Sequence, residues 1–168
     1  ARGTKVDLSL LHSSSNEEYD VEIVRDRIPI HSVVASFIIE EDVGYIKVIR
    51  FSATTAAEFA EAMHNLERDG ATSVIVDLRA NGGGYMSAAT DMIDRFLDQG
   101  LGIVYTEGKA SPRRDYVSKY DGEYRNWPIA VLIDESSASA SEIFAGAMQD
   151  NDRGLIVGRR SFGKGLVQ

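Results

Sequence analysis

The first 24 residues alternate between apolar and polar side chains in two runs, residues 5–11 and 19–24, with a polar turn between them. A period of two is typical of half-buried strands, so this region predicts a β-hairpin. A hairpin of two strands is only marginally stable in water and must pack on something else. Pro29 cannot donate a hydrogen bond to a strand ladder, so we place a boundary there between residues 1–28 and 29–168.

Beyond this boundary the pattern becomes one of apolar strands followed by amphipathic helices. The predicted strands are 32–39, 44–51, 73–78, 101–105, 129–133 and 154–157, and the predicted helices are 55–69, about 85–98 and a helix ending near 150. Residues 107–127 are polar and rich in Gly, Arg and Asp, and we predict no strand or helix there. Repeated strand–helix units from residue 44 onward predict an α/β domain with a largely parallel sheet.

Composition narrows the class of protein. Hydrophobic residues make up 43% of the 168 residues and charged residues 26%, as in a globular domain. The net charge of −8 and the lack of a basic stripe argue against nucleic-acid binding. The chain has no cysteine, which excludes disulfides and thiolate catalysis, and its three scattered histidines are not expected to bind metal. No apolar run reaches the ~20 residues that span a bilayer, and the first residues resemble neither a signal peptide nor a natural start.

Three unusual loops follow strands of the predicted sheet: residues 79–84, 134–139 and 158–165. In open α/β sheets, sites form beyond the carboxyl ends of the strands. These loops are therefore expected to lie together and to form the functional site.

The loop after strand 129–133 contains serines 136, 137, 139 and 141. Ser139 and Glu142 match the S-x-x-E capping box, a common way to start a helix that needs no further function. A hydroxyl at a helix N-terminus also faces unpaired N–H groups that favour negative charge. Ser139 is therefore either a cap or a nucleophile, and it can be both.

The glycine run at residues 82–84 lies between a strand and a helix. It is either a plain turn or a loop whose N–H groups form an oxyanion hole. The phosphate-binding pattern G-x-G-x-x-G fails here because residue 87 is Ser. Near the end of the chain, residues 158–165 match G-x-x-x-x-G-K but place Gly165 where a phosphate loop needs Ser or Thr, so nucleotide binding is not expected.

Lys164 is either a surface lysine or a general base. A lysine in water titrates near ~10.4, but burial can lower its pKa by several units and let the neutral amine accept a proton from serine. Without cysteine or a suitably placed histidine, Ser plus Lys is the simplest nucleophile–base pair in the chain.

Four motifs together resemble the C-terminal processing peptidases, also called tail-specific proteases. They are Leu78-Arg-Ala-Asn-Gly-Gly-Gly84, Ser137-Ala-Ser-Ala-Ser-Glu-Ile143, Gly146-Ala-Met-Gln-Asp150 and Gly158-x4-Gly-Lys-Gly165. The resemblance implies a crotonase/Clp-protease-like α/β fold, and the leading hairpin looks like the end of the PDZ domain that precedes the peptidase core. It also implies a truncated core, because most of the PDZ domain and the later strands of the family are missing.

The resemblance assigns roles to matching positions. Ser139 matches the nucleophile and Lys164 the general base of a Ser–Lys dyad. Gln168 matches a residue that orients the lysine in some members. The N–H of Ala140 and one from Gly83 or Gly84 would form the oxyanion hole.

The implied function is serine endopeptidase activity on proteins or peptides with accessible C-terminal tails, in the periplasm or cell envelope, without a cofactor or metal. The alternative is an inactive peptide- or ligand-binding relative that uses the same cleft.

The family usually has Asn-Pro-Gly-Gly where this chain has Asn81-Gly-Gly-Gly84, so a looser loop is expected. The fragment itself is expected to be inactive if nothing desolvates its lysine.

Overall fold

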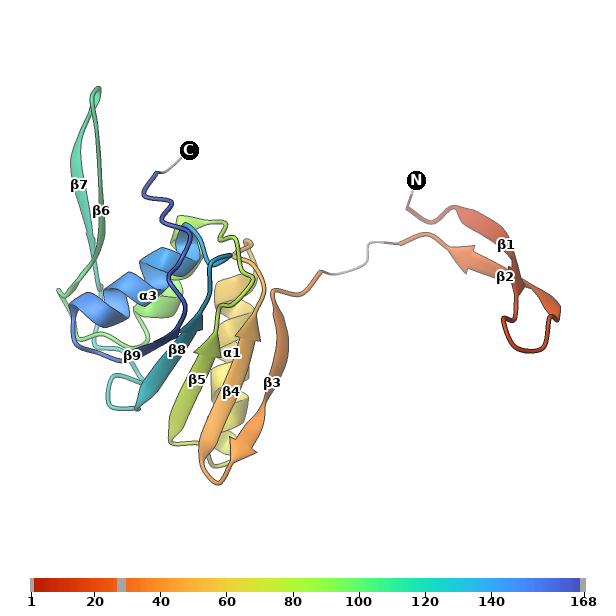
Figure 1. The fold of residues 1–168 in the computed structure, drawn as a ribbon, viewed down its shortest axis with the longest axis horizontal. Helices are drawn as coiled ribbons and strands as arrows, with labels where there is room; N and C mark the ends of the chain where they lie inside the picture. The colour runs from red at the N-terminus through yellow and green to blue at the C-terminus, as the bar shows by residue number, and fades with distance from the viewer. Residues whose placement is uncertain (1, 27–29, 167–168) are drawn as a thin grey trace. The chain divides into compact units, whose positions relative to one another are not determined.

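A computed structural model describes residues 2–26 and 30–166, and the chain divides into two compact units, residues 1–30 and 31–168 (Figure 1). The first unit consists of β1 (Lys5–Leu11) and β2 (Glu18–Val24), which pair antiparallel and confirm the predicted hairpin. Its assignment to a PDZ domain stays a prediction. The predicted boundary at residues 28 and 29 falls outside the described residues.

The second unit is built on a five-stranded sheet with the order β3-β4-β5-β8-β9. The strands are β3 (Val33–Glu40), β4 (Val43–Val48), β5 (Ser73–Asp77), β8 (Ile129–Ile133) and β9 (Leu155–Gly158). The β3–β4 pair is antiparallel, and every other pair in this sheet is parallel. This mostly parallel sheet confirms the predicted α/β fold class.

Three helices accompany the sheet: α1 (Thr55–Arg68), α2 (Met86–Ile93) and α3 (Ala140–Asp150). The core contains alternate residues of β4, β5 and β8 and the apolar sides of the helices, for example Phe59 and Phe144, together with Phe96 from the turn after α2. Residues of the opposite strand faces, such as Tyr45 and Ile75, are only half-buried. Period-two burial in the strands and helical periodicity in α1 and α3 therefore arise from one shared core.

Helix α1 ends where the sequence predicts. Gly70 adopts φ +99°, its N–H donates to Glu67 O, and the N–H of Ala71 donates to Leu66 O. These bonds satisfy carbonyls at the helix end, and the left-handed backbone angle explains the glycine.

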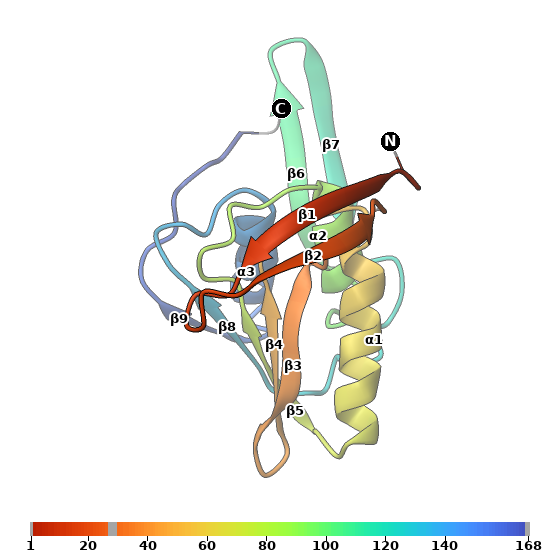
Figure 2. The same ribbon diagram turned by 90° about the vertical axis from the view of Figure 1, so that its right-hand side faces the viewer.

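Near residues 94–117 the predicted end of one helix was wrong and one strand was missed. Helix α2 ends at Ile93 rather than about 98. Beyond Ile93 the backbone forms turns with hydrogen bonds between residues three apart, such as Phe96 N–H to Ile93 O, in place of the α-helical spacing of four. The second difference is a strand in the region predicted to have none: β7 (Ser111–Val117) pairs antiparallel with β6 (Gly102–Gly108). These two strands form a separate ribbon that projects from the rest of the unit (Figures 1 and 2).

Within the described ranges, no helix is both long and apolar enough to span a bilayer. The same part of the chain holds no group of three or more His, Cys, Asp or Glu side chains that could bind a metal ion.

Candidate active site

The three predicted loops meet at the carboxyl edge of the parallel strands. The glycine loop (residues 79–84) follows β5, and the serine loop (residues 134–139) follows β8. The third loop was predicted at 158–165; Gly158 belongs to β9, and we call residues 159–166 the lysine segment. Ala138 N–H donates to Asn81 O at 3.1 Å, and Phe162 N–H donates to Ser137 O at 3.0 Å. These bonds join the serine loop to both of its neighbours, as the sheet order requires.

The serines of this region have different structural roles. Ser137 and Ser141 are fully buried, and their hydroxyls donate to the carbonyls of Leu78 and Asn81 at 2.8 and 2.9 Å. The Ser137 bond holds the serine loop against the end of the strand that precedes the glycine loop, and the Ser141 bond holds the start of α3 against the glycine loop itself. Ser136 is exposed and its N–H donates to the carboxylate of Asp134, so its hydroxyl takes no part in this contact.

Ser139 differs from the other serines in its backbone. It is the N-cap of α3, half-buried, with φ 55° and ψ −113°. A residue with a Cβ rarely adopts these angles, which cost on the order of 1–3 kcal/mol. The carboxylate of Glu142 accepts a hydrogen bond from Ser139 N–H at 2.8 Å, as the S-x-x-E pattern predicts. The surrounding bonds therefore hold Ser139 in a strained turn between β8 and α3.

Asn81 fixes the glycine loop from inside. Its side chain is fully buried, donates to Val48 O at 2.9 Å and accepts from Gly83 N–H at 2.9 Å. A buried amide satisfied in this way determines the position of the loop relative to β4. Asn81 was absent from the sequence-based site, although it lies inside the motif that carries the family resemblance.

Gly83 and Gly84 both have positive φ, at +95° and +145°. A Cβ on Gly83 would lie 2.9 Å from the Ala140 nitrogen, and a Cβ on Gly84 would lie 2.0 Å from Phe51 O. Only glycine allows these approaches, so the glycine loop packs directly against the start of α3.

The N–H groups near this contact are not equivalent. Gly83 N–H is engaged by Asn81, whereas no hydrogen bond from the N–H of Gly84 or Ala140 occurs among the described residues. The two N–H groups without a partner come from different segments. Gly84 belongs to the glycine loop, and Ala140 is the first residue of α3. Of the two glycines named in the sequence prediction, Gly84 is thus the one whose N–H has no partner among the described residues.

Glu142 connects Ser139 to the lysine segment. Its Oε1 accepts from Ser161 Oγ at 2.8 Å and from Gly163 N–H at 2.6 Å. Its Oε2 accepts from the N–H groups of Ser139 and Lys164 at 2.8 and 2.9 Å. Partial burial raises the pKa of Glu142, but the Ser161 hydroxyl and the three backbone donors outweigh burial and lower the pKa below its usual value. Glu142 is therefore an ionised link between the two loops.

Ser139 and Lys164 both line a cleft of about 530 Å³. Lys164 is exposed, and no hydrogen bond joins its side chain to Ser139 in the part of the chain that the structure describes. The structure thus brings the expected nucleophile and base to one cleft without a hydrogen bond between them. Gln168 lies outside the described residues.

A charged cluster supports the glycine loop. The buried carboxylate of Asp77 accepts from Tyr45 at 2.7 Å, from Lys47 at 3.0 Å and from the Arg79 guanidinium at 2.6 Å. Burial alone would raise the pKa of Asp77, but the bonds to Arg79, Tyr45 and Lys47 lower it well below its usual range. The cluster anchors the end of β5, from which the glycine loop departs.

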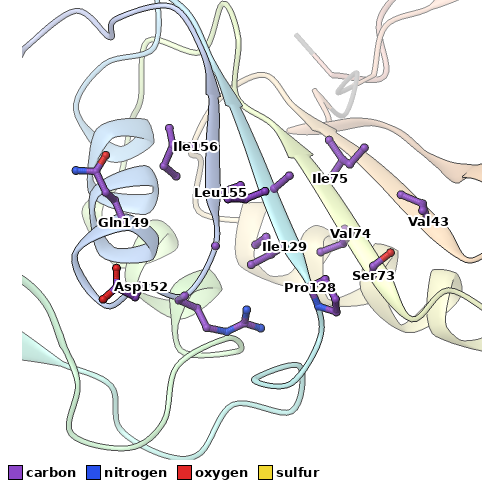
Figure 3. A pocket seen from close by; sticks show the side chains of 13 residues that line it. Val43, Ser73, Val74, Ile75, Pro128, Ile129, Gln149, Asp152, Leu155 and Ile156 are labelled. Atoms are coloured by element: carbon purple, nitrogen blue, oxygen red, sulfur yellow. The ribbon is translucent and has the colours of Figure 1, made fainter.

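A second cavity of about 630 Å³ lies at the opposite ends of the strands, lined by the first residues of β4, β5, β8 and β9 (Figure 3). Its charged side chains are Asp152 and Arg153. The Arg153 guanidinium donates to the carbonyls of Phe96, Tyr124 and Trp127 at 2.6–2.8 Å, which is a structural role. This cavity contains none of the predicted site residues.

The fold and this three-loop site place the chain among α/β proteins with a serine at the start of a helix and a glycine loop beside it. The profile of peptidase family S41 matches residues 42–168. The chain belongs to peptidase family S41.

Similar proteins agree with this membership. The chain is 36% identical to the carboxyl-terminal-processing protease of Synechocystis sp. over 99% of its own length and 39% of that protein. It is 37% identical to the carboxy-terminal processing protease CtpA of Bacillus subtilis, of which it covers 35%. The solved structure of a photosystem II D1 C-terminal processing protease matches with a TM-score of 0.75 and 28% identity, over 99% of this chain and 46% of that one. The chain therefore spans less than half the length of these relatives.

Proposed function

We propose that the protein containing this chain is a serine endopeptidase that cleaves proteins or peptides near their C-terminal tails. The observation that carries the proposal is the strained placement of Ser139 at the start of α3, in one cleft with Lys164. Relatives named carboxyl-terminal-processing proteases support the substrate class. By the same analogy, we propose a location outside the cytoplasm, in the periplasm or cell envelope.

The mechanism is acyl transfer. The neutral amine of Lys164 accepts the proton of Ser139 Oγ, and this oxygen attacks the carbonyl carbon of the scissile peptide bond. The negative charge that develops on the carbonyl oxygen is stabilised by the N–H groups of Ala140 and Gly84. The lysine then donates its proton to the leaving amine, and water releases the acyl group from Ser139 by the reverse sequence.

Lys164 has to lose its proton before it can act. Lys164 is exposed, so its side-chain nitrogen is open to solvent water in the state described. A peptide that fills the cleft would displace this water and favour the neutral amine. Gln168 would orient the amine, as the family resemblance implies.

The test compares serines of the same loop in the full-length protein. Ser139→Ala and Lys164→Ala are each expected to reduce kcat/KM for peptide cleavage by about a thousandfold or more. Ser136→Ala is the matched control, because this exposed serine lies three residues from Ser139. The Ser136→Ala protein should cleave peptides like the wild type.

The alternative is a relative that binds peptides without cleaving them, and the absence of a Ser139–Lys164 hydrogen bond is the observation that favours it. Cleavage that is unchanged in both the Ser139 and the Lys164 variants would contradict the proposed dyad. Peptide binding without cleavage by the wild-type protein would support the alternative.

A further inference from the structure

The cleft beside Ser139 extends along one side of α3. The α3 residues and cap that line it are Ser139, Glu142, Ile143, Gly146, Ala147 and Asp150. Their spacing of three and four residues defines a single helical face. The cleft thus begins at the nucleophile and follows this face toward the end of the helix.

The opposite wall is the β6–β7 ribbon. Its residues Ile103, Val104 and Val117 line the cleft, with the ion pair of Arg113 and Asp115 at 2.7 Å. The ribbon base is tied to α3, because Asn151 Nδ2 donates to Gly102 O at 2.9 Å and to Ala147 O at 2.8 Å. The width of the cleft is therefore fixed at its far end.

The helical face changes character along its length. Glu142 is next to the nucleophile, and Ile143, Gly146 and Ala147 form an apolar middle section. Ile143 lies one turn and Gly146 two turns beyond Ser139, which is about 6 and 10.5 Å along the axis. A Cβ placed on Gly146 would have no atom within 4 Å beyond its own helix and chain neighbours. The missing side chain leaves open space in the apolar section.

We propose that this apolar section binds the side chain of the residue whose carbonyl Ser139 attacks, and that Gly146 is the residue that sets how long this side chain can be. During acyl transfer this residue becomes covalently attached to Ser139, so its side chain must lie within a few atoms of that oxygen. A short side chain reaches only the level of Ile143. A longer apolar one, such as that of Met or Phe, extends toward the open space beside Gly146.

A polar or charged side chain is disfavoured in this section, because Ile143, Ala147 and Ile103 offer it no hydrogen-bond partner. The ligand class is therefore an unbranched or aromatic apolar side chain on the acyl side of the scissile bond. This inference rests on the proposed peptidase function and adds a specificity determinant to it.

The test uses the full-length protein and two sets of fluorogenic peptides. One set carries Ala, Leu, Met or Phe on the acyl side of a defined bond, and the other varies the leaving side in the same way. Gly146→Leu fills the open space and is expected to lower kcat/KM for Phe relative to Ala on the acyl side by about tenfold or more. Gly146→Ala should shift this ratio in the same direction by a smaller factor.

Gln149→Leu is the matched control. It adds the same side chain to the same helix at an exposed position outside the cleft, so it should leave the ratio unchanged. Thermal unfolding of each variant shows whether it is folded, and the Gly146→Ala variant keeps the test valid if Gly146→Leu does not fold.

An unchanged acyl-side ratio in folded Gly146 variants would overturn the inference. So would a change of ratio confined to the leaving-side set, which would show that the cleft binds the other product. Failure of the peptidase proposal is distinguishable, because the wild-type protein would then cleave none of the peptides.

Discussion

The two sides of the site are built differently. The glycine and serine loops are joined by buried groups, since Asn81, Ser137 and Ser141 are all inaccessible to solvent and hydrogen-bonded to backbone. The lysine segment is largely exposed and is held mainly through the carboxylate of Glu142. The comparison indicates that the proposed nucleophile and the N–H groups proposed to bind the oxyanion are held by buried contacts at the edge of the sheet. The proposed base, Lys164, is therefore positioned largely by the carboxylate of Glu142, with the bond from Phe162 N–H to Ser137 O as a further link.

The largest expected effect concerns the side that is held by buried contacts. In Gly84→Ala, the new Cβ would meet Phe51 O at 2.0 Å, at a φ of +145° that side chains rarely adopt. The loop has to move, so we expect a loss of about 2–3 kcal/mol in unfolding free energy. Displacement of the Gly84 N–H should lower kcat by roughly 10²–10³-fold. Chemical denaturation and peptide cleavage measure the two effects.

Gly82→Ala is the control for this change, because a Cβ there meets no atom within 4 Å and its φ is not left-handed. It should be as stable as the wild type or slightly more stable. Wild-type cleavage by Gly84→Ala would show that its N–H has no role in stabilising the transition state.

A smaller effect is expected on the side held by Glu142. In Glu142→Gln, the amide keeps only one acceptor oxygen for four donors, and its NH₂ group faces N–H groups. The lysine segment should shift relative to Ser139, with a loss of about tenfold to a hundredfold in kcat/KM. Peptide cleavage by the folded variant measures this loss.

Glu135→Gln is the matched control, because Glu135 also links the serine loop to the lysine segment through Arg159 but is 65% exposed. An exposed pair of this kind contributes little, so its variant should cleave like the wild type. An equal loss of kcat/KM in Glu142→Gln and Glu135→Gln would contradict this. It would mean that the negative charge of the serine-loop region, rather than the four hydrogen bonds to Glu142, positions the lysine segment.

The smallest expected effect is the pH dependence of stability. Because the pKa of Glu142 is lowered in the folded state, its stabilising contribution is fully present above its unfolded pKa of about 4.3 and is lost as the pH falls through the folded value. The Tm of the wild type should exceed that of Glu142→Gln by a few degrees near pH 7, and this difference should shrink below about pH 4. A difference that grows on acidification would contradict this.

The sequence predicts the parts of the fold that share the central core. Strands β5 and β8 are short apolar runs and α1 has helical periodicity, because each contributes a buried face to this core. Strand β7 was missed because its side chains are mostly exposed and its order comes from pairing with β6 and from contacts such as Arg113 over the Tyr105 ring at 4.0 Å. Contacts of this kind do not produce a periodic pattern of apolar residues, so such a pattern cannot predict them.

For the site, the motifs identify the loops but not the bonds between them. The hydrogen bond from Asn81 to Val48 O joins residues 33 positions apart, and its existence depends on the register of β4 and β5. The S-x-x-E pattern predicts the bond between Ser139 and Glu142, but not the three further donors from the lysine segment, which lie 19 to 22 residues away.

The left-handed backbone of Ser139 has a consequence for how variants of this protein are screened. Glycine adopts such angles without a Cβ penalty and costs only a few tenths of a kcal/mol as an N-cap. A Ser139→Gly protein should therefore lack the hydroxyl and yet melt at a higher temperature than the wild type. Selection for thermal stability alone would remove the proposed nucleophile, so the serine at this position is expected to be retained only by selection for what its hydroxyl does.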